Sequence, residues 1–193
     1  MSTFQLFFQL GFEHILDPEG YDHILFVIAL CAGYFLKDWL RIVILVTAFT
    51  IGHSLTLALA ALNIIQFNVA VIEFLIPLSI LITLAHNLVR PIKKFHRKFS
   101  AKYFYALFFG LIHGLGFSNY LRSILGKDAS IVEQLLAFNI GLEVGQLIIV
   151  FFFMVFTFVF TQVLNIKRRD WVIGVSCLTA GLTIPILIEN IFW

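Results

Sequence analysis

The chain has 193 residues, of which 61% are hydrophobic, 16% aromatic and 12% charged, and its formal net charge is +2. Soluble domains contain about 25% charged residues, so this composition excludes an ordinary soluble enzyme. It predicts an all-α, polytopic membrane bundle in which residues 1–193 form a single transmembrane domain. The two cysteines, Cys31 and Cys177, lie within apolar runs without a CxxC motif, which argues against a disulfide framework or a thiolate metal site.

The first predicted element is a short N-terminal helix over residues 3–16. Its bulky apolar residues alternate with Gln5, Gln9, Glu13 and His14, so it is too polar to span a bilayer. This pattern is typical of an interfacial or re-entrant helix. The sequence Asp17-Pro18-Glu19-Gly20 then breaks the chain.

Six predicted transmembrane helices follow this break. The first is short for a hydrocarbon core of about 30 Å, and the fifth is long enough to tilt or to extend beyond the bilayer. Their approximate ranges are 21–36, 39–62, 67–89, 102–120, 135–162 and 171–192.

The basic residues predict the orientation of the bundle. Eleven of the thirteen lysines and arginines fall in the first, third and fifth connections, whereas Arg122 and Lys127 fall on the other side. By the positive-inside rule, both termini are expected outside, which is the periplasmic side of a bacterial inner membrane. The basic run in residues 90–102 is a topology signal of this kind, and no nucleic-acid partner is expected.

The first span opens with an adjacent acid and imidazole, Asp22 and His23. One of them could ligate a metal ion while the other orients a ligand, because metal-bound imidazoles usually donate their second N–H to a carboxylate. The alternative is that Asp22 serves only as a polar cap at the start of the helix.

The second and third spans also carry ionisable residues. His53 lies beside a polar stripe that includes Thr50 and Ser54, and it could either bind a metal or hydrogen-bond a neighbouring helix. Glu73 precedes Pro77 by one turn. It could be a ligand, a proton acceptor, or the group that satisfies the carbonyl left free by the proline.

The fourth and fifth spans combine close-packing signals with polar residues. His113 lies within the pair Gly110 and Gly114, and Glu143 within the pair Gly141 and Gly145. Such GxxxG pairs let two membrane helices approach closely. Along the fifth span, Asn139, Glu143 and Gln146 follow the spacing i, i+4, i+7 and share one face.

These ionisable residues are expected to converge in the outer half of the bundle. A charge in hydrocarbon costs several kcal/mol, so such residues indicate partners or a function. Imidazole and carboxylate ligands without cysteine or methionine suit Ni²⁺, Zn²⁺, Co²⁺ or Fe²⁺. The sequence has no GxSxG, Walker or HExxH motif, so it gives no support for a serine hydrolase, a nucleotide-binding protein or a zincin.

Five stretches of the sequence resemble the HupE/UreJ family of bacterial membrane proteins, which is associated with nickel supply to metalloenzymes. They are HIL…GYDHILF (residues 14–26), TAFTIGHSLTL (47–57), IEFLIPLSI (72–80), FGLIHGLGF (109–117) and FNIGLEVGQ (138–146). The resemblance implies a six-span, nickel-type permease or accessory protein, with a metalloenzyme maturation system as a possible partner. It places the functional positions at His14, Asp22, His23, His53, Glu73, His113 and Glu143. Seven residues separate His14 from Asp22, a longer gap than the family usually has.

Three functions therefore remain open from the sequence. The leading one is a permease that captures a divalent ion from outside, with nickel or zinc favoured. The second is an intramembrane metal-dependent hydrolase acting on a lipid or lipid-linked substrate, with ligands His23, His53 and His113 and an acid or base among Glu73, Glu143 and Asp22. The third is a membrane scaffold that uses the metal only for its structure.

Overall fold

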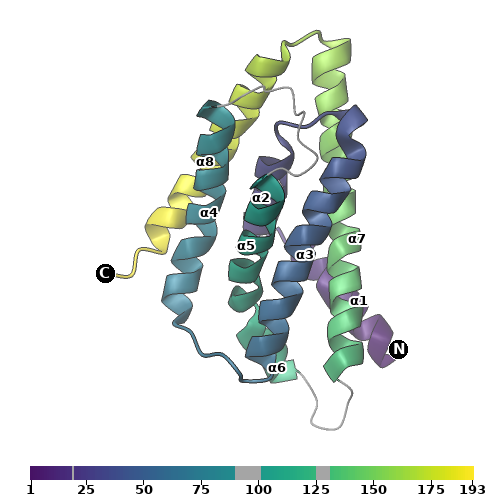
Figure 1. The fold of residues 1–193 in the computed structure, drawn as a ribbon, viewed down its shortest axis with the longest axis vertical. Coiled ribbons are helices and arrows are strands. Elements are labelled where there is room, and N and C mark those ends of the chain that lie inside the picture. Colours follow the sequence, from purple (N-terminus) through teal and green to yellow (C-terminus); the bar gives the residue numbers. More distant parts are fainter. Residues whose placement is uncertain (19, 90–100, 125–130) are drawn as a thin grey trace.

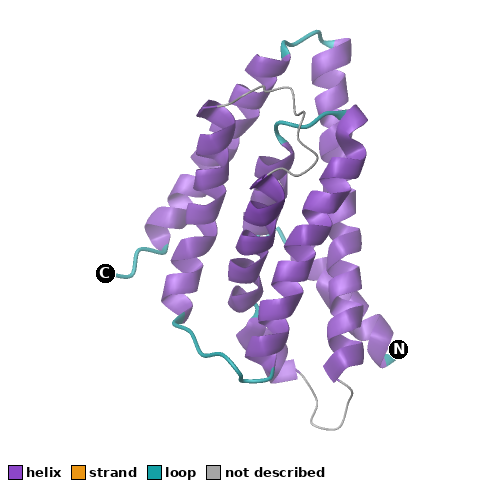
Figure 2. Cartoon of the chain, viewed as in Figure 1, coloured by secondary structure: helices purple, strands orange, loops and turns teal. Residues whose placement is uncertain are grey.

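The computed structural model describes residues 1–18, 20–89, 101–124 and 131–193 (Figure 1). Within these residues all regular secondary structure is helical, which confirms the predicted fold class (Figure 2). The elements in chain order are α1 (Thr3–Leu16), α2 (Asp22–Cys31), the 3₁₀ turn η1 (Leu36–Asp38), α3 (Trp39–Ala61), α4 (Val69–Val89), α5 (Ala101–Gly116), α6 (Ser118–Ile124), α7 (Ile131–Phe158), the π-helical turn η2 (Val159–Val163) and α8 (Arg168–Glu189).

Four helical segments of the described chain are long and apolar enough to cross a membrane. They coincide with the second, third, fifth and sixth predicted spans, so the chain is a multi-pass membrane protein. The full count of six spans is not confirmed, because the other two predicted spans are interrupted. The four segments are Leu36–Ala61, Val69–Val89, Ile131–Val163 and Arg168–Glu189.

The first predicted span, residues 21–36, needs correction. Its helix α2 has 10 residues, which corresponds to about 15 Å and only half of a bilayer core. Figure 1 shows α1 rising from the end of the bundle near the N-terminus and α2 continuing toward the opposite end. The break at residues 17–21 therefore joins two short helices that follow one another through the depth of the bundle.

The helix that was expected at residues 3–16, interfacial or re-entrant, is present as α1, and it packs lengthwise against α7. The backbones of the two helices touch: a Cβ on Gly11 would overlap the carbonyl of Phe138, and one on Gly141 would overlap the carbonyl of Phe8. The amphipathic pattern thus reflects burial against another helix. The N-terminus of α1 carries a capping box formed by Ser2 and Gln5.

The fourth predicted span, residues 102–120, is divided as well. Helix α5 ends at Gly116, and the short helix α6 starts at Ser118. Helix α5 packs closely on α3, since a Cβ on Gly110 would overlap the carbonyl of Phe49, and one on Gly114 the carbonyl of His53. The reciprocal glycine on α3 is Gly52, which lies against the carbonyl of Leu107. These contacts fix the position of His53 relative to α5.

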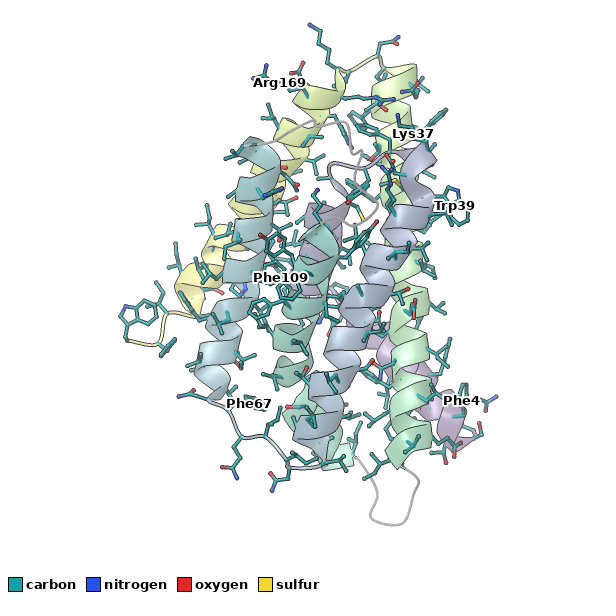
Figure 3. All side chains as sticks on the ribbon, viewed as in Figure 1. Phe4, Lys37, Trp39, Phe67, Phe109 and Arg169 are labelled. Carbon is teal, nitrogen blue, oxygen red and sulfur yellow. The ribbon has the colours of Figure 1, made fainter. Side chains whose placement is uncertain are left out.

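The side chains labelled in Figure 3 show the polarity of the bundle. Lys37 and Arg169 lie at one end and Phe67 at the other, as expected if the first and fifth connections share one side of the membrane. The basic residues Arg90, Lys93, Lys94, Arg97, Lys98 and Lys127, which entered the orientation argument, lie outside the described residues.

Candidate metal centre

Three imidazoles from three different helices meet inside the bundle. His14 at the end of α1, His23 at the start of α2 and His53 on α3 each offer a ring nitrogen, and these nitrogens lie within 4.8 Å of one another. The ring centroids of His14 and His23 are 4.6 Å apart, and that of His53 lies 6.3 Å and 6.4 Å from them. The break between α1 and α2 is what brings His14 beside His23, despite the long gap in sequence.

The ring of His23 is oriented by its neighbour in sequence. Asp22 Oδ1 accepts hydrogen bonds from His23 Nδ1 at 2.9 Å and from the backbone N–H of His23 at 2.8 Å. His23 Nε2 is buried without a hydrogen-bond partner. One oxygen of Asp22 thus pairs a backbone N–H in the first turn of α2 and also holds His23 Nδ1, which leaves Nε2 available for a metal.

His53 lies at the floor of the cluster and is fully buried. Neither of its ring nitrogens has a hydrogen-bond partner of normal geometry. On α7, Asn139 Nδ2 donates to the carbonyl of Leu135 at 2.7 Å, and the amide oxygen of Asn139 is buried without a hydrogen-bond partner.

A fourth imidazole adjoins the three. His113 on α5 has its ring centroid 5.3 Å from that of His23. Its Nδ1 lies 2.9 Å from the carbonyl of Phe109, an acceptor, so Nδ1 carries the proton. His113 Nε2 is buried without a partner. The same pattern as in His23 therefore recurs, with one nitrogen held and the other available as a ligand.

A cavity of about 880 Å³ opens beside these imidazoles, bounded by residues of α1, α2, α4 and α5 and by the break between α1 and α2. Its lining includes His14, His23 and His113. Four acidic side chains also line it, and no lysine or arginine does so among the described residues. The acidic residues are Glu13, Asp17, Asp22 and Glu73. Coulombic attraction would therefore concentrate cations in front of the cluster.

Two of these acids were absent from the predicted site. Glu13 precedes His14, and Asp17 lies in the segment that was interpreted only as a break in the chain. The signal that could have identified Asp17 is its place between His14 and Asp22. An acidic residue that lies in a helix break between two histidines is expected to line the cavity that the break creates.

The two predicted glutamates occupy different places. Glu73 on α4 is exposed and lines the cavity, but it is not part of the three-imidazole group. Glu143 on α7 accepts a hydrogen bond from Thr47 Oγ1 at 2.7 Å and lines a separate groove between α3 and α7. These two glutamates therefore lie outside the three-imidazole group.

The remaining polar residues of the predicted site support the helices. Thr50 donates to Gln146 Oε1 at 2.9 Å, which links α3 to α7. Ser54 donates to the carbonyl of Thr50 at 2.6 Å, one turn earlier in α3. Aromatic rings complete the wall of the site: the centroid of Phe117 lies 3.9 Å from that of His14, and the ring of Phe138 stacks on His53 at 6.3 Å.

The donor set is thus rich in nitrogen. Imidazole nitrogens that lie close together suit Ni²⁺, Zn²⁺ or Co²⁺, whereas Mg²⁺ and Ca²⁺ prefer oxygen ligands. With three imidazoles in the group and His113 beside it, four ligands are within reach, the number that tetrahedral zinc takes.

A family model described as HupE / UreJ protein matches residues 1–190. No curated protein and no solved structure matches the chain.

Proposed function

The chain belongs to the HupE/UreJ family, and from this premise we propose that it transports or supplies a divalent metal ion, nickel or zinc, across the bacterial inner membrane. The ion is the cargo, bound by His14, His23 and His53 with His113 beside them. A metalloenzyme maturation system on the cytoplasmic side is the partner that would use the ion.

The observation that carries this proposal is the convergence of unpartnered imidazole nitrogens. A buried polar atom without a hydrogen bond costs about 1–3 kcal/mol. Four such atoms occur here on four helices, namely the Nε2 atoms of His14, His23, His53 and His113. A bound cation would satisfy several of them at once, which explains why the bundle tolerates them together.

The acidic cavity supports capture from one side. With the termini outside, as the basic connections predict, this cavity faces the periplasm. Ions would first meet the exposed carboxylates of Glu13, Asp17 and Glu73 and then pass to the buried imidazoles. Exchange of exposed oxygen ligands for buried nitrogen ligands would select against Mg²⁺ and Ca²⁺ along this route.

The test begins with metal content. We expect the purified protein to bind nickel or zinc in a fixed ratio, measured by elemental analysis and calorimetry. Replacement of His53 or His113 by alanine should abolish that binding. His86→Ala is the matched control, because His86 lies on α4 against a different cavity. Lack of bound metal in the unmodified protein would contradict the proposal.

Uptake into proteoliposomes then separates transport from supply. Flux of radioactive nickel or zinc that disappears in His53→Ala would establish transport. Stoichiometric binding without flux would leave a scaffold or a metal-supply accessory. The hydrolase alternative gains no support from the family match.

A further inference from the structure

An apolar groove of about 780 Å³ lies between α2, α7 and α8. Apart from Asp170 and Thr179, every described residue that lines it is aliphatic, aromatic or glycine. Three of the lining residues, Phe152, Phe156 and Leu178, are exposed. The groove therefore opens between two spanning segments toward the surrounding membrane. Its volume lies in the range of about 300–1,000 Å³ that is usual for ligand-binding pockets.

The groove exists because α7 and α8 diverge. Figure 1 shows the two helices separating from their shared connection, and each packs mainly on another partner, α7 on α1 and α8 on α4. No glycine contact closes the gap on the side of α8. A Cβ on Gly174, which lines the groove, would meet nothing within 4 Å.

The length of the groove matches one leaflet of a bilayer. Its lining on α8 runs from Trp171 to Leu182, and eleven helical steps correspond to about 17 Å. One leaflet supplies half of the hydrocarbon core, about 15 Å. A single lipid acyl chain that lies along α8 would therefore fill the groove from the end of the bundle to its middle.

One end of the groove has the features of a membrane interface. The ring of Trp171 lies there, with its centroid 4.9 Å from that of Phe160 and 6.3 Å from that of Phe153. Tryptophan is enriched at the level of the lipid headgroups. The indole N–H of Trp171 is buried and has no acceptor. The ester carbonyls of a glycerophospholipid are acceptors at this depth, so a lipid could satisfy it.

The same end carries an excess of positive charge. Lys167, Arg168 and Arg169 directly precede Trp171 and are exposed, and Asp170 is the one acidic residue of this run, which leaves an excess of two positive charges. The guanidinium of Arg168 lies 4.3 Å from the ring centroid of Phe35, so it is held against the bundle. This charge is complementary to an anionic lipid headgroup.

We propose that the groove binds one anionic phospholipid from the leaflet at the basic end of the bundle. An acyl chain lies between α7 and α8, and the phosphate lies near Lys167 and Arg169. Because Leu16 and Ile24 also line the groove, the lipid packs beside the break between α1 and α2. This inference is independent of the proposed metal transport.

The acyl chain is tested by filling the groove. The full-length protein is reconstituted in liposomes of phosphatidylglycerol and phosphatidylethanolamine in equal amounts, extracted in mild detergent and analysed by native mass spectrometry. One lipid should remain bound to the unmodified protein, and Gly174→Leu should lose it. Gly181→Leu is the matched control and should keep the lipid, because Gly181 lies on the same helix with equally open space but outside the groove.

Three results of this experiment would overturn the proposal. They are the absence of a retained lipid in the unmodified protein, equal retention in the two leucine variants, and a protein dimer that Gly174→Leu dissociates. The last result would show that a second copy of the chain occupies the groove.

The headgroup is tested by removing charge. The retained lipid should be mainly phosphatidylglycerol, and Lys167→Gln combined with Arg169→Gln should lose this preference. Lys37→Gln combined with Arg41→Gln removes the same charge at the same end of the bundle, away from the groove, and should keep the preference. A preference that is absent from the unmodified protein, or lost equally in both pairs, would contradict an anionic headgroup site.

Fluorescence provides a measurement in the intact bilayer. In a variant with Trp39→Phe and Trp193→Phe, both at exposed positions, Trp171 is the remaining tryptophan. Phosphatidylglycerol with brominated acyl chains should quench it at a lower mole fraction than brominated phosphatidylethanolamine, and Gly174→Leu should abolish this difference. Equal quenching by the two lipids before that substitution would overturn the inference.

Discussion

At the scale of single residues, the arrangement around each imidazole is what makes the site suited to a metal. His23 Nδ1 is held by Asp22 and His113 Nδ1 by the carbonyl of Phe109, so in both rings Nε2 remains free. The partners differ in charge: a carboxylate raises the basicity of its imidazole more than a carbonyl does. His23 is therefore expected to be the stronger of these two ligands.

This difference gives a residue-scale prediction. Asp22→Asn should weaken nickel or zinc binding by about 10–100-fold, the usual effect of removing a partner that orients a metal ligand. Isothermal titration calorimetry measures the change. Asp38→Asn is a suitable control, since Asp38 pairs with Arg41 near the opposite end of α3 and should leave the affinity unaltered. Equal affinity in Asp22→Asn and the unmodified protein would show that Asp22 acts only as a cap.

At the scale of helices, close backbone contacts position the ligands. Helices α3 and α5 meet at Gly52, Gly110 and Gly114, and α1 meets α7 at Gly11 and Gly141. Because protein interiors are close-packed, side chains at these points would push the helices apart. His53 lies beside the first contact and His14 at the end of the second, so the positions of both imidazoles depend on the separation of these helices.

The corresponding prediction compares two glycines in helices. Gly110→Ala should destabilise the protein by about 1–3 kcal/mol, because the new methyl group would overlap the backbone of α3 near His53. It should also weaken metal binding. Gly174→Ala in α8 meets nothing within 4 Å, so it should be neutral or stabilising by up to about 1 kcal/mol. Thermal unfolding in detergent measures both, and similar effects of the two substitutions would contradict the packing argument.

At the scale of the whole molecule, the polar residues are distributed unevenly along the bundle. The imidazole cluster and acidic cavity lie toward the end at which α1 begins, and the labelled basic residues Lys37 and Arg169 lie at the opposite end. From the positive-inside rule we expect the cavity to lie on the outer side of the membrane. In the proposed function, the direction of metal capture would follow from the placement of the charged connections.

Cysteine labelling in intact cells tests this orientation. In a variant with Cys31 and Cys177 replaced by alanine, Gln66→Cys in the connection between α3 and α4 should react with a membrane-impermeant maleimide. Lys37→Cys in η1 should react only after the membrane is permeabilised. Both positions are exposed, so burial would not explain a difference. The reverse pattern would place the acidic cavity on the cytoplasmic side.

The sequence by itself determined the class of the protein and the residue types of its site. Its low charge and long apolar runs require a helical membrane bundle, because backbone groups in hydrocarbon must be paired within each segment. The histidines His53 and His113 could also be identified from the sequence, because each is an ionisable residue within an otherwise apolar helix.

Only the tertiary structure decided which of these residues come together. Periodicity is a local property, so it could not show that α1 and α2 follow one another and bring His14 to His23 and His53. Nor could it show that Glu143 belongs to a different groove, because that depends on the rotation of α7 against α3. Helix rotation and separation are set by packing between segments distant in sequence, and here the glycine contacts fix them.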